Sequence, residues 1–300
     1  MNLLFLFLVF LLGLCAGSYV NMLVFRTAKR YEIQIPNLKS QFPNKKNKNK
    51  KRIRKEVDKR FSFCDGCGRR LKWYENIPVL SWILQKGKSR CCDSPLPLSY
   101  PVVELTTGLL FVISLLVLIP TGSFDYAQDD TLILILMISF VVVTFLVFGL
   151  LMDLKYMILP DFGTAILIVC ALIMNLLTNS DGILLQVFAV AKAMADRQDD
   201  VLVGVGAFGF LLFLHLITKG KGMGMGDVKF AFFMGTFLGF KKVVLAFYIA
   251  FILGAVVGVV LLLLKKVKRK TQIAFGPFLI VGVFLSWWWG DCLKFLIFNF

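Results

Sequence analysis

Two aspartates stand where apolar segments end or begin, and carboxylates in such places can do chemistry. Asp153 follows the apolar run Thr144–Met152, and Asp227 lies in a glycine-rich stretch 74 residues further along. A carboxylate near the membrane core is costly and usually faces a cavity, so each is a candidate functional residue. Two carboxylates held close share one proton, which leaves one group to activate water and the other to protonate. Such a pair can hydrolyse a peptide bond without a metal.

Each aspartate also has a simpler interpretation. Asp153 could be an interfacial residue beside Lys155, and Asp227 could be the N-cap of the helix that follows it. Gly224 and Gly226, just before Asp227, favour the functional interpretation. Without side chains they let the backbone bend and let an extended substrate come close.

Four cysteines form a second candidate site, this time for a metal. Cys64 and Cys67 form a C-x-x-C knuckle, and the adjacent Cys91 and Cys92 follow about 25 residues on. Four thiolates are the ligands of a structural zinc site, which has no open position for catalysis. Adjacent cysteines can both ligate one metal only if the backbone turns sharply. The alternatives are a site that has lost its metal and a redox pair, which a cytoplasmic thiol pool disfavours.

Composition indicates the elements that must position these groups. The 300 residues are 58% apolar with 30 Phe, more than one globular core would bury. A helix needs roughly 20 apolar residues to cross a membrane. We therefore predict an all-α polytopic membrane protein with about eight transmembrane helices, at 2–25, 99–120, 131–151, 160–178, 200–217, 228–240, 243–264 and 273–289. The first has no basic n-region, so we expect a retained helix rather than a signal peptide.

Charge sets the expected orientation and divides the chain. Residues 26–97 hold 20 Lys or Arg against 6 Asp or Glu, which is +14 of the net +16. Such a loop is kept in the cytoplasm or lies on anionic lipid, so the partner it indicates is membrane lipid and not nucleic acid. Both aspartates then fall on the cytoplasmic side, and only Lys241 and Lys242 fall on the wrong one. We expect a first helix (1–25), a basic cytoplasmic loop with the cysteines (26–98) and a membrane peptidase core (99–300), with a flexible insertion at 39–60.

The order of several motifs resembles the type IV prepilin peptidase family, also called prepilin leader peptidase/N-methyltransferase. The strongest matches are Asp153 followed by Leu159-Pro160-Asp161, and the G-x-G-D at 224–227 with Lys229. The resemblance also covers the segments 13–21, 76–82, 100–104 and 274–278. It implies that Asp153 and Asp227 are catalytic, and that Pro160, Asp161, Gly224, Gly226 and Lys229 are supporting motif positions.

The resemblance further implies the substrates, the cofactor and the location. Prepilins or pseudopilins would be cleaved at the cytoplasmic face of a bacterial inner membrane, and the new amino terminus methylated with S-adenosylmethionine. The family usually has a second C-x-x-C, but this chain has Ser89 where its first cysteine would stand. That departure leaves open a peptidase that no longer methylates. A transporter using the two aspartates as an ion relay is an alternative from another class.

Overall fold

The computed structural model describes residues 3–34, 62–118 without 63, 65, 66 and 68, 130–179, 200–264 without 221 and 222, and 274–298. The expected insertion at 39–60 lies outside these residues. The described residues form helices and no strand, which confirms the all-α prediction. The elements are α1 (Leu3–Gln34), η2 (Trp73–Asn76), α3 (Leu80–Leu84), α4 (Ser99–Leu118), α5 (Asp130–Tyr156), α6 (Asp161–Asn179), α8 (Asp200–Ile217), α9 (Met225–Leu263) and α10 (Gly276–Phe298).

Length and composition make this a multi-pass membrane protein. Within the described ranges, five helices are long and apolar enough to cross a bilayer, namely α1, α4, α5, α8 and α9. The apolar parts of α6 and α10 are shorter. Helix α1 runs nine residues beyond the predicted end at Phe25. Its extra turns carry Arg26 and Lys29, whose long side chains let a helix continue past the apolar layer.

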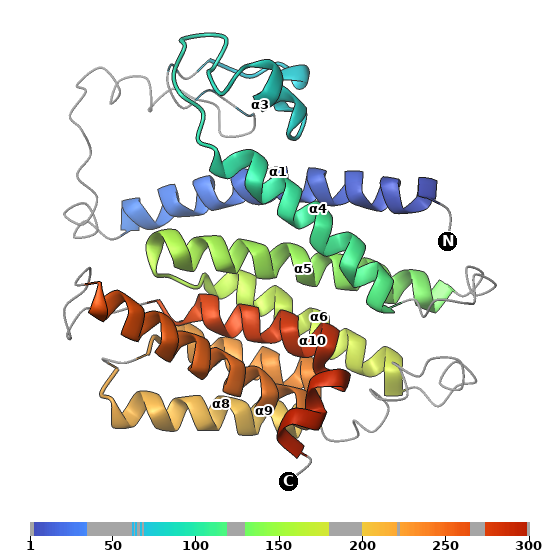
Figure 1. The fold of residues 1–300 in the computed structure, drawn as a ribbon, viewed down its shortest axis with the longest axis vertical. Coiled ribbons are helices and arrows are strands. Elements are labelled where there is room, and N and C mark those ends of the chain that lie inside the picture. The colour runs from blue at the N-terminus through green and yellow to red at the C-terminus, as the bar shows by residue number, and fades with distance from the viewer. Residues whose placement is uncertain are drawn as a thin grey trace. The chain divides into compact units, whose positions relative to one another are not determined.

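The chain forms two compact units, residues 1–113 and 114–300. In the first unit, glycines let α1 and α4 cross closely, as Figure 1 shows. A Cβ on Gly13 would lie 2.6 Å from the Cα of Gly108, and one on Gly17 would lie 2.7 Å from the Cα of Glu104. Small residues at this spacing allow backbones to touch inside a membrane. This crossing places the polar residues of α1 beside Glu104.

In the second unit, α9 reverses direction at Gly239, whose φ of 71° lies outside the helical region. A straight helix of its 39 residues would be about 58 Å long, nearly twice the apolar thickness of a bilayer. Gly235 touches Gly204 of α8, and Met223 is bonded to His215, so the first half runs antiparallel to α8. The ring of Phe247 then contacts Phe210, back toward the other end of α8. The halves therefore form a hairpin, near the predicted break between 240 and 243.

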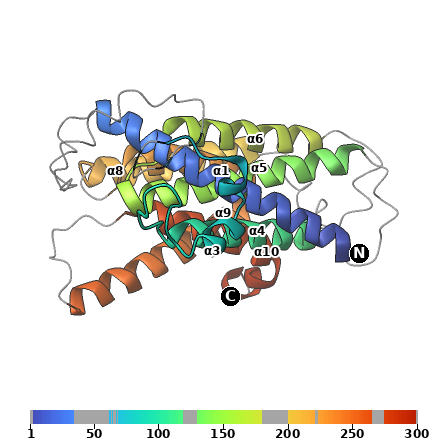
Figure 2. The ribbon, with the colours of Figure 1, turned by 90° about the horizontal axis from the view of Figure 1, so that it is seen from above.

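The remaining helices of the second unit pack around this hairpin. Helix α10 lies against the second half of α9, where Gly282 meets the backbone of Ala246 and Gly290 meets the side chain of Lys242. Figure 2 shows α5 and α6 side by side. Helix α6 also packs against α9, and α5 also packs against α10. Lys242 is buried in a helix and is not a loop residue. The charge rule, which counts residues in loops, therefore does not apply to it.

Candidate active site and cysteine cluster

Asp153 is buried in the last turn of α5. Its relative exposure is 5%, and its Oδ2 has no hydrogen-bond partner among the described atoms. The first residue of α10, Gly276, lies directly against it. A Cβ at Gly276 would stand 2.5 Å from Oδ2, closer than two such atoms can approach. Only glycine therefore fits beside this carboxyl group as it is placed.

Asp227 is buried in the first turn of α9, with a relative exposure of 7%. The N-cap of α9 is Gly224, and Asp227 is the third helical residue. Its Oδ2 accepts the backbone N–H of Gly224 at 3.2 Å. Asp227 is therefore not the N-cap residue, although its Oδ2 does accept a backbone N–H at the start of the helix. Gly276, which touches Asp153, lies against Leu159, and so does Gly226, which precedes Asp227. The start of α9 therefore lies beside the end of α5, and the two aspartates lie near one another.

Leu159 packs beneath the two aspartates from the short connection between α5 and α6. Its Cβ would lie 3.0 Å from a Cβ on Gly226, and its Cδ1 3.1 Å from one on Gly276. Gly226 is therefore needed for packing inside the protein. Gly224 differs, because a Cβ there would meet only Asp227 and Gly226 at ordinary distances and the residue is exposed. Of the two glycines, only Gly224 offers open backbone to a substrate.

The other predicted motif residues lie at the ends of the same helices. Pro160 is buried, and its carbonyl accepts the N–H groups of Gly163 and Thr164 at the start of α6. Asp161 and Lys229 form an ion pair of 2.8 Å that joins α6 to α9. Their side chains remain 71% and 45% exposed. The pair therefore lies at the surface beside the aspartates, where solvent screens it.

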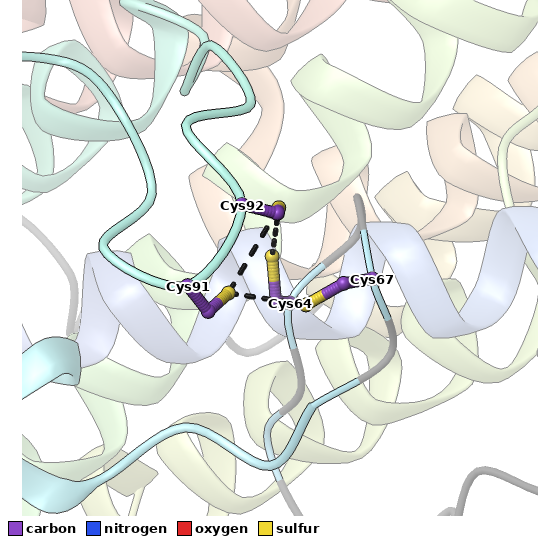
Figure 3. A group of neighbouring side chains, drawn as sticks. All are labelled: Cys64, Cys67, Cys91 and Cys92. Atoms are coloured by element: carbon purple, nitrogen blue, oxygen red, sulfur yellow. Dashed lines mark hydrogen bonds between the residues drawn. The ribbon is translucent and has the colours of Figure 1, made fainter.

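The four cysteines gather in the first unit, as predicted. Figure 3 shows Cys64 and Cys67 on one segment and Cys91 and Cys92 on another, with their sulfurs facing one another. Sγ–Sγ distances are 3.1 Å for Cys67 and Cys91 and 3.7 Å for Cys64 and Cys92, and all four sulfurs lie within 4.8 Å of one another. A tetrahedral ion with metal–sulfur bonds of ~2.3 Å needs sulfurs ~3.8 Å apart. The donor set and its spacing therefore fit a metal ion.

The thiols influence one another strongly. The backbone of Arg69 favours the thiolate of Cys67, but the neighbouring thiols of Cys91, Cys64 and Cys92 together with burial raise the pKa of Cys67 to about 12. Thiols packed this closely cannot all ionise without a cation between them. A metal must therefore displace protons when it binds.

Comparison with known proteins decides the family. The model of the bacterial peptidase A24 N-terminal domain matches residues 11–118, and that of the type IV leader peptidase family matches residues 140–259. The prepilin leader peptidase/N-methyltransferase of Aeromonas salmonicida is 30% identical over 297 residues, which cover 95% of this chain and 91% of that protein. The chain belongs to the type IV leader peptidase family.

Other members are equally similar along their length. The proteins of the same name from Aeromonas hydrophila and Pseudomonas aeruginosa are 30% and 28% identical, over 91% and 89% of their lengths and 95% and 94% of this chain. No solved structure matches the chain.

This family member replaces one expected cysteine, and the structure shows what stands there. The Oγ of Ser89 lies 3.2 Å from the sulfur of Cys64 and 3.1 Å from that of Cys91, in a buried position. Cys91 thus brings its sulfur to within hydrogen-bonding distance of the substituted side chain. The leader peptidase keeps four sulfurs in the cluster although the spacing of its cysteines has changed.

Two residues near Asp153 and Asp227 could not be singled out from the sequence. Gly276 belongs to a quoted segment, 274–278, but nothing in its local sequence indicates contact with Asp153. The second is His215, whose Nδ1 lies 2.8 Å from the carbonyl oxygen of Met223 and whose ring packs on Gly220. It therefore braces the turn that leads into Asp227.

Proposed function

We propose that this protein cleaves the leader peptides of type IV prepilins or pseudopilins with Asp153 and Asp227, and methylates the new amino terminus. The observation that carries the peptidase proposal is that two buried carboxyls, from segments far apart in sequence, lie on either side of Leu159. The family and the printed name of its relatives supply the substrate class and the second activity.

In the proposed mechanism the two aspartates hold one proton between them. The ionised carboxylate takes a proton from a water molecule, whose oxygen attacks the scissile carbonyl carbon. The protonated carboxyl group stabilises the oxygen of that carbonyl, and a proton then passes to the leaving nitrogen as the C–N bond breaks. Such dyads titrate as a pair, so the two roles are assigned to the pair. The Oδ2 of Asp153 is buried and has no hydrogen-bond partner among the described atoms, so a water molecule that enters the site with the substrate would find an acceptor there.

The location of the site suits a substrate that enters from the membrane surface. Both aspartates lie in terminal turns of apolar helices, at the level where chain leaves the apolar layer. A prepilin would keep its apolar helix in the bilayer and its leader in the cytoplasm of the bacterial inner membrane, with its backbone passing the open Gly224. The basic loop supports this orientation.

The cysteine cluster would hold a structural zinc ion. Cys64, Cys67, Cys91 and Cys92 would supply four thiolates and leave no open coordination position. The ion would therefore tie the 62–70 segment to the 88–97 segment and take no part in peptide hydrolysis.

Methylation would use S-adenosylmethionine as a cofactor. When bound, it would supply a methyl group on a sulfonium sulfur, which the new amino terminus takes with loss of one proton while the carbon–sulfur bond breaks. The protein would have to bind the cofactor, expel water and receive the cleaved amino terminus.

Cleavage of a prepilin in membranes, followed as a mass shift, tests the peptidase proposal. Wild type should cut, and Asp153→Asn and Asp227→Asn should each be slower by about 10² to 10⁴, because each removes one partner in proton transfer. Asp93→Asn, which removes an exposed carboxylate from the first unit, is the matched control. A wild-type rate from either dyad variant, in folded protein of equal abundance, would show that the pairing is wrong.

A further inference from the structure

An apolar groove in the second unit lies between α8 and the second half of α9, two helices that Figure 1 shows side by side. Its volume is about 620 Å³, and every lining residue is apolar apart from the hydroxyl group of Tyr248. The buried residues Ala207, Val243 and Phe247 form its floor. Phe210 and Tyr248 stand on its two rims and are 47% and 57% exposed. The proposed proton transfers use none of these residues.

Gly206 lowers the α8 wall of this groove. A Cβ on Gly206 would meet no described atom within 4 Å, whereas one on Gly204 would lie 2.6 Å from the side chain of Thr236 in α9. Gly204 is therefore needed for the packing of α8 on α9, but Gly206 is not. Small residues on a membrane helix allow the backbone of a second helix to come into contact. A helix that lay in the groove would find such a surface at Gly206.

The groove leads to the two aspartates along both of its walls. On the α9 wall, the ring of Phe251 lies 5.2 Å from the ring of Phe275, and the next residue, Gly276, touches Asp153. On the other wall, α8 continues to the turn that leads into Asp227. A polypeptide that occupies the groove can therefore reach both carboxyls along the surface of the second unit.

The helices give the level of the groove relative to the aspartates. Gly235 touches Gly204, so these two residues lie at one level. Eight residues of α9 separate Gly235 from Asp227, which is about 12 Å of helix. Gly206 is two residues closer to the aspartates than Gly204, at about 9 Å. A bound α-helix covers that length with about six residues.

We propose that this groove binds the apolar helix of the substrate, with about the sixth residue after the scissile bond beside Gly206. The proposal rests on the proposed peptidase function and names the surface that receives its substrate. A lipid chain and a second copy of this protein are also apolar. Of these occupants, only the substrate must also reach the aspartates, so the continuity of the groove with Gly276 and Asp153 favours the substrate.

Cleavage kinetics of a prepilin by the full-length protein, at fixed detergent concentration, test the proposal. Gly206→Leu places a side chain in the groove and should raise KM about tenfold, the loss expected when one apolar side chain of the substrate is no longer buried. The kcat should change little, because the groove is occupied equally before and during the reaction.

Gly209→Leu is the matched control for the kinetics. It is the same substitution on the same helix, and a Cβ there also meets no described atom within 4 Å, but Gly209 does not line the groove. It should cleave as wild type does. A wild-type KM in Gly206→Leu would overturn the proposal, and so would an equal rise in both variants. If wild type itself cuts no prepilin, the proposed function fails; if only the difference between the variants is absent, the groove alone fails.

Cross-linking tests the position of the substrate without relying on the rate. Gly206→Cys is combined with Asp153→Asn, which slows cleavage, and mixed with a prepilin that has one cysteine at the sixth residue after the scissile bond. Mild oxidation should join the two chains through a disulfide. Val205→Cys in the same background is the control, because Val205 is exposed but lies outside the groove. Equal cross-linking at both positions would overturn the proposal. Cross-linking of two enzyme chains through residue 206, with or without prepilin, would instead show an interface between copies and overturn it as well.

Discussion

Replacement of Gly276 by alanine tests whether the position of Asp153 matters more than its presence. A Cβ at residue 276 would stand 2.5 Å from Oδ2 of Asp153, whereas ordinary contacts begin at 3.4 Å, so the carboxyl must move by about 0.9 Å. Misplacement of a catalytic group by ~1 Å can cost ~10²-fold in rate, or about 2.7 kcal/mol of transition-state stabilisation. We therefore expect Gly276→Ala to lower kcat for prepilin cleavage about 100-fold.

Stability should respond differently from the rate. The atom that must move is the end of a side chain, and alanine lowers the entropy of the unfolded chain, which is worth about 0.4–1 kcal/mol in favour of the variant. The melting temperature should thus change little. Gly254→Ala is the matched control, because a Cβ there meets Phe278, near the start of α10, at an ordinary 3.5 Å. A folded Gly276→Ala enzyme that cuts at the wild-type rate would refute the placement of Asp153 in the site.

Two further predictions concern the surface pair and the cysteine cluster. Lys229→Met should change the unfolding free energy by less than about 1 kcal/mol, because the Lys229–Asp161 ion pair is largely exposed and solvent screens it. A larger loss of unfolding free energy in a denaturant titration would show that the ion pair is not screened by solvent. Zinc affinity, measured by competition with a chromophoric chelator, should rise with pH by about tenfold per pH unit for each proton displaced, because the raised pKa of Cys67 keeps the metal-free thiol protonated at neutral pH. A pH-independent affinity would show that the thiols are not the ligands.

Residues whose chemistry conflicts with their surroundings could be found from the sequence. Asp153 and Asp227 stand out because carboxylates are rare at the ends of apolar helices, and the cysteines stand out by spacing. Gly276 could not be found in this way, since its role comes from the approach of α10 to α5, which no local pattern records. The same holds for Ser89, whose contact with two sulfurs depends on how the segment turns.

The helices were predictable to the extent that apolar composition defines them. The break in α9 was expected between 240 and 243 because two lysines interrupt the apolar run, and it falls at Gly239. The end of α1 was placed too early, because charge marks the edge of the apolar layer and not the end of a helix. Burial of Lys242 was not expected, since its contact with Gly290 is tertiary.

The contact between Gly276 and Asp153 has a consequence for the order of events during synthesis. Asp153 and Asp227 are both made before α10, yet the surface against which Asp153 rests belongs to α10. A growing chain that has inserted α5 and the α9 hairpin already contains Asp153 and Asp227, but it lacks the contact of Gly276 with Asp153. In the proposed mechanism the two aspartates therefore reach their final geometry only when α10 docks, so a nascent chain would begin to cleave substrates only after α10 has been inserted.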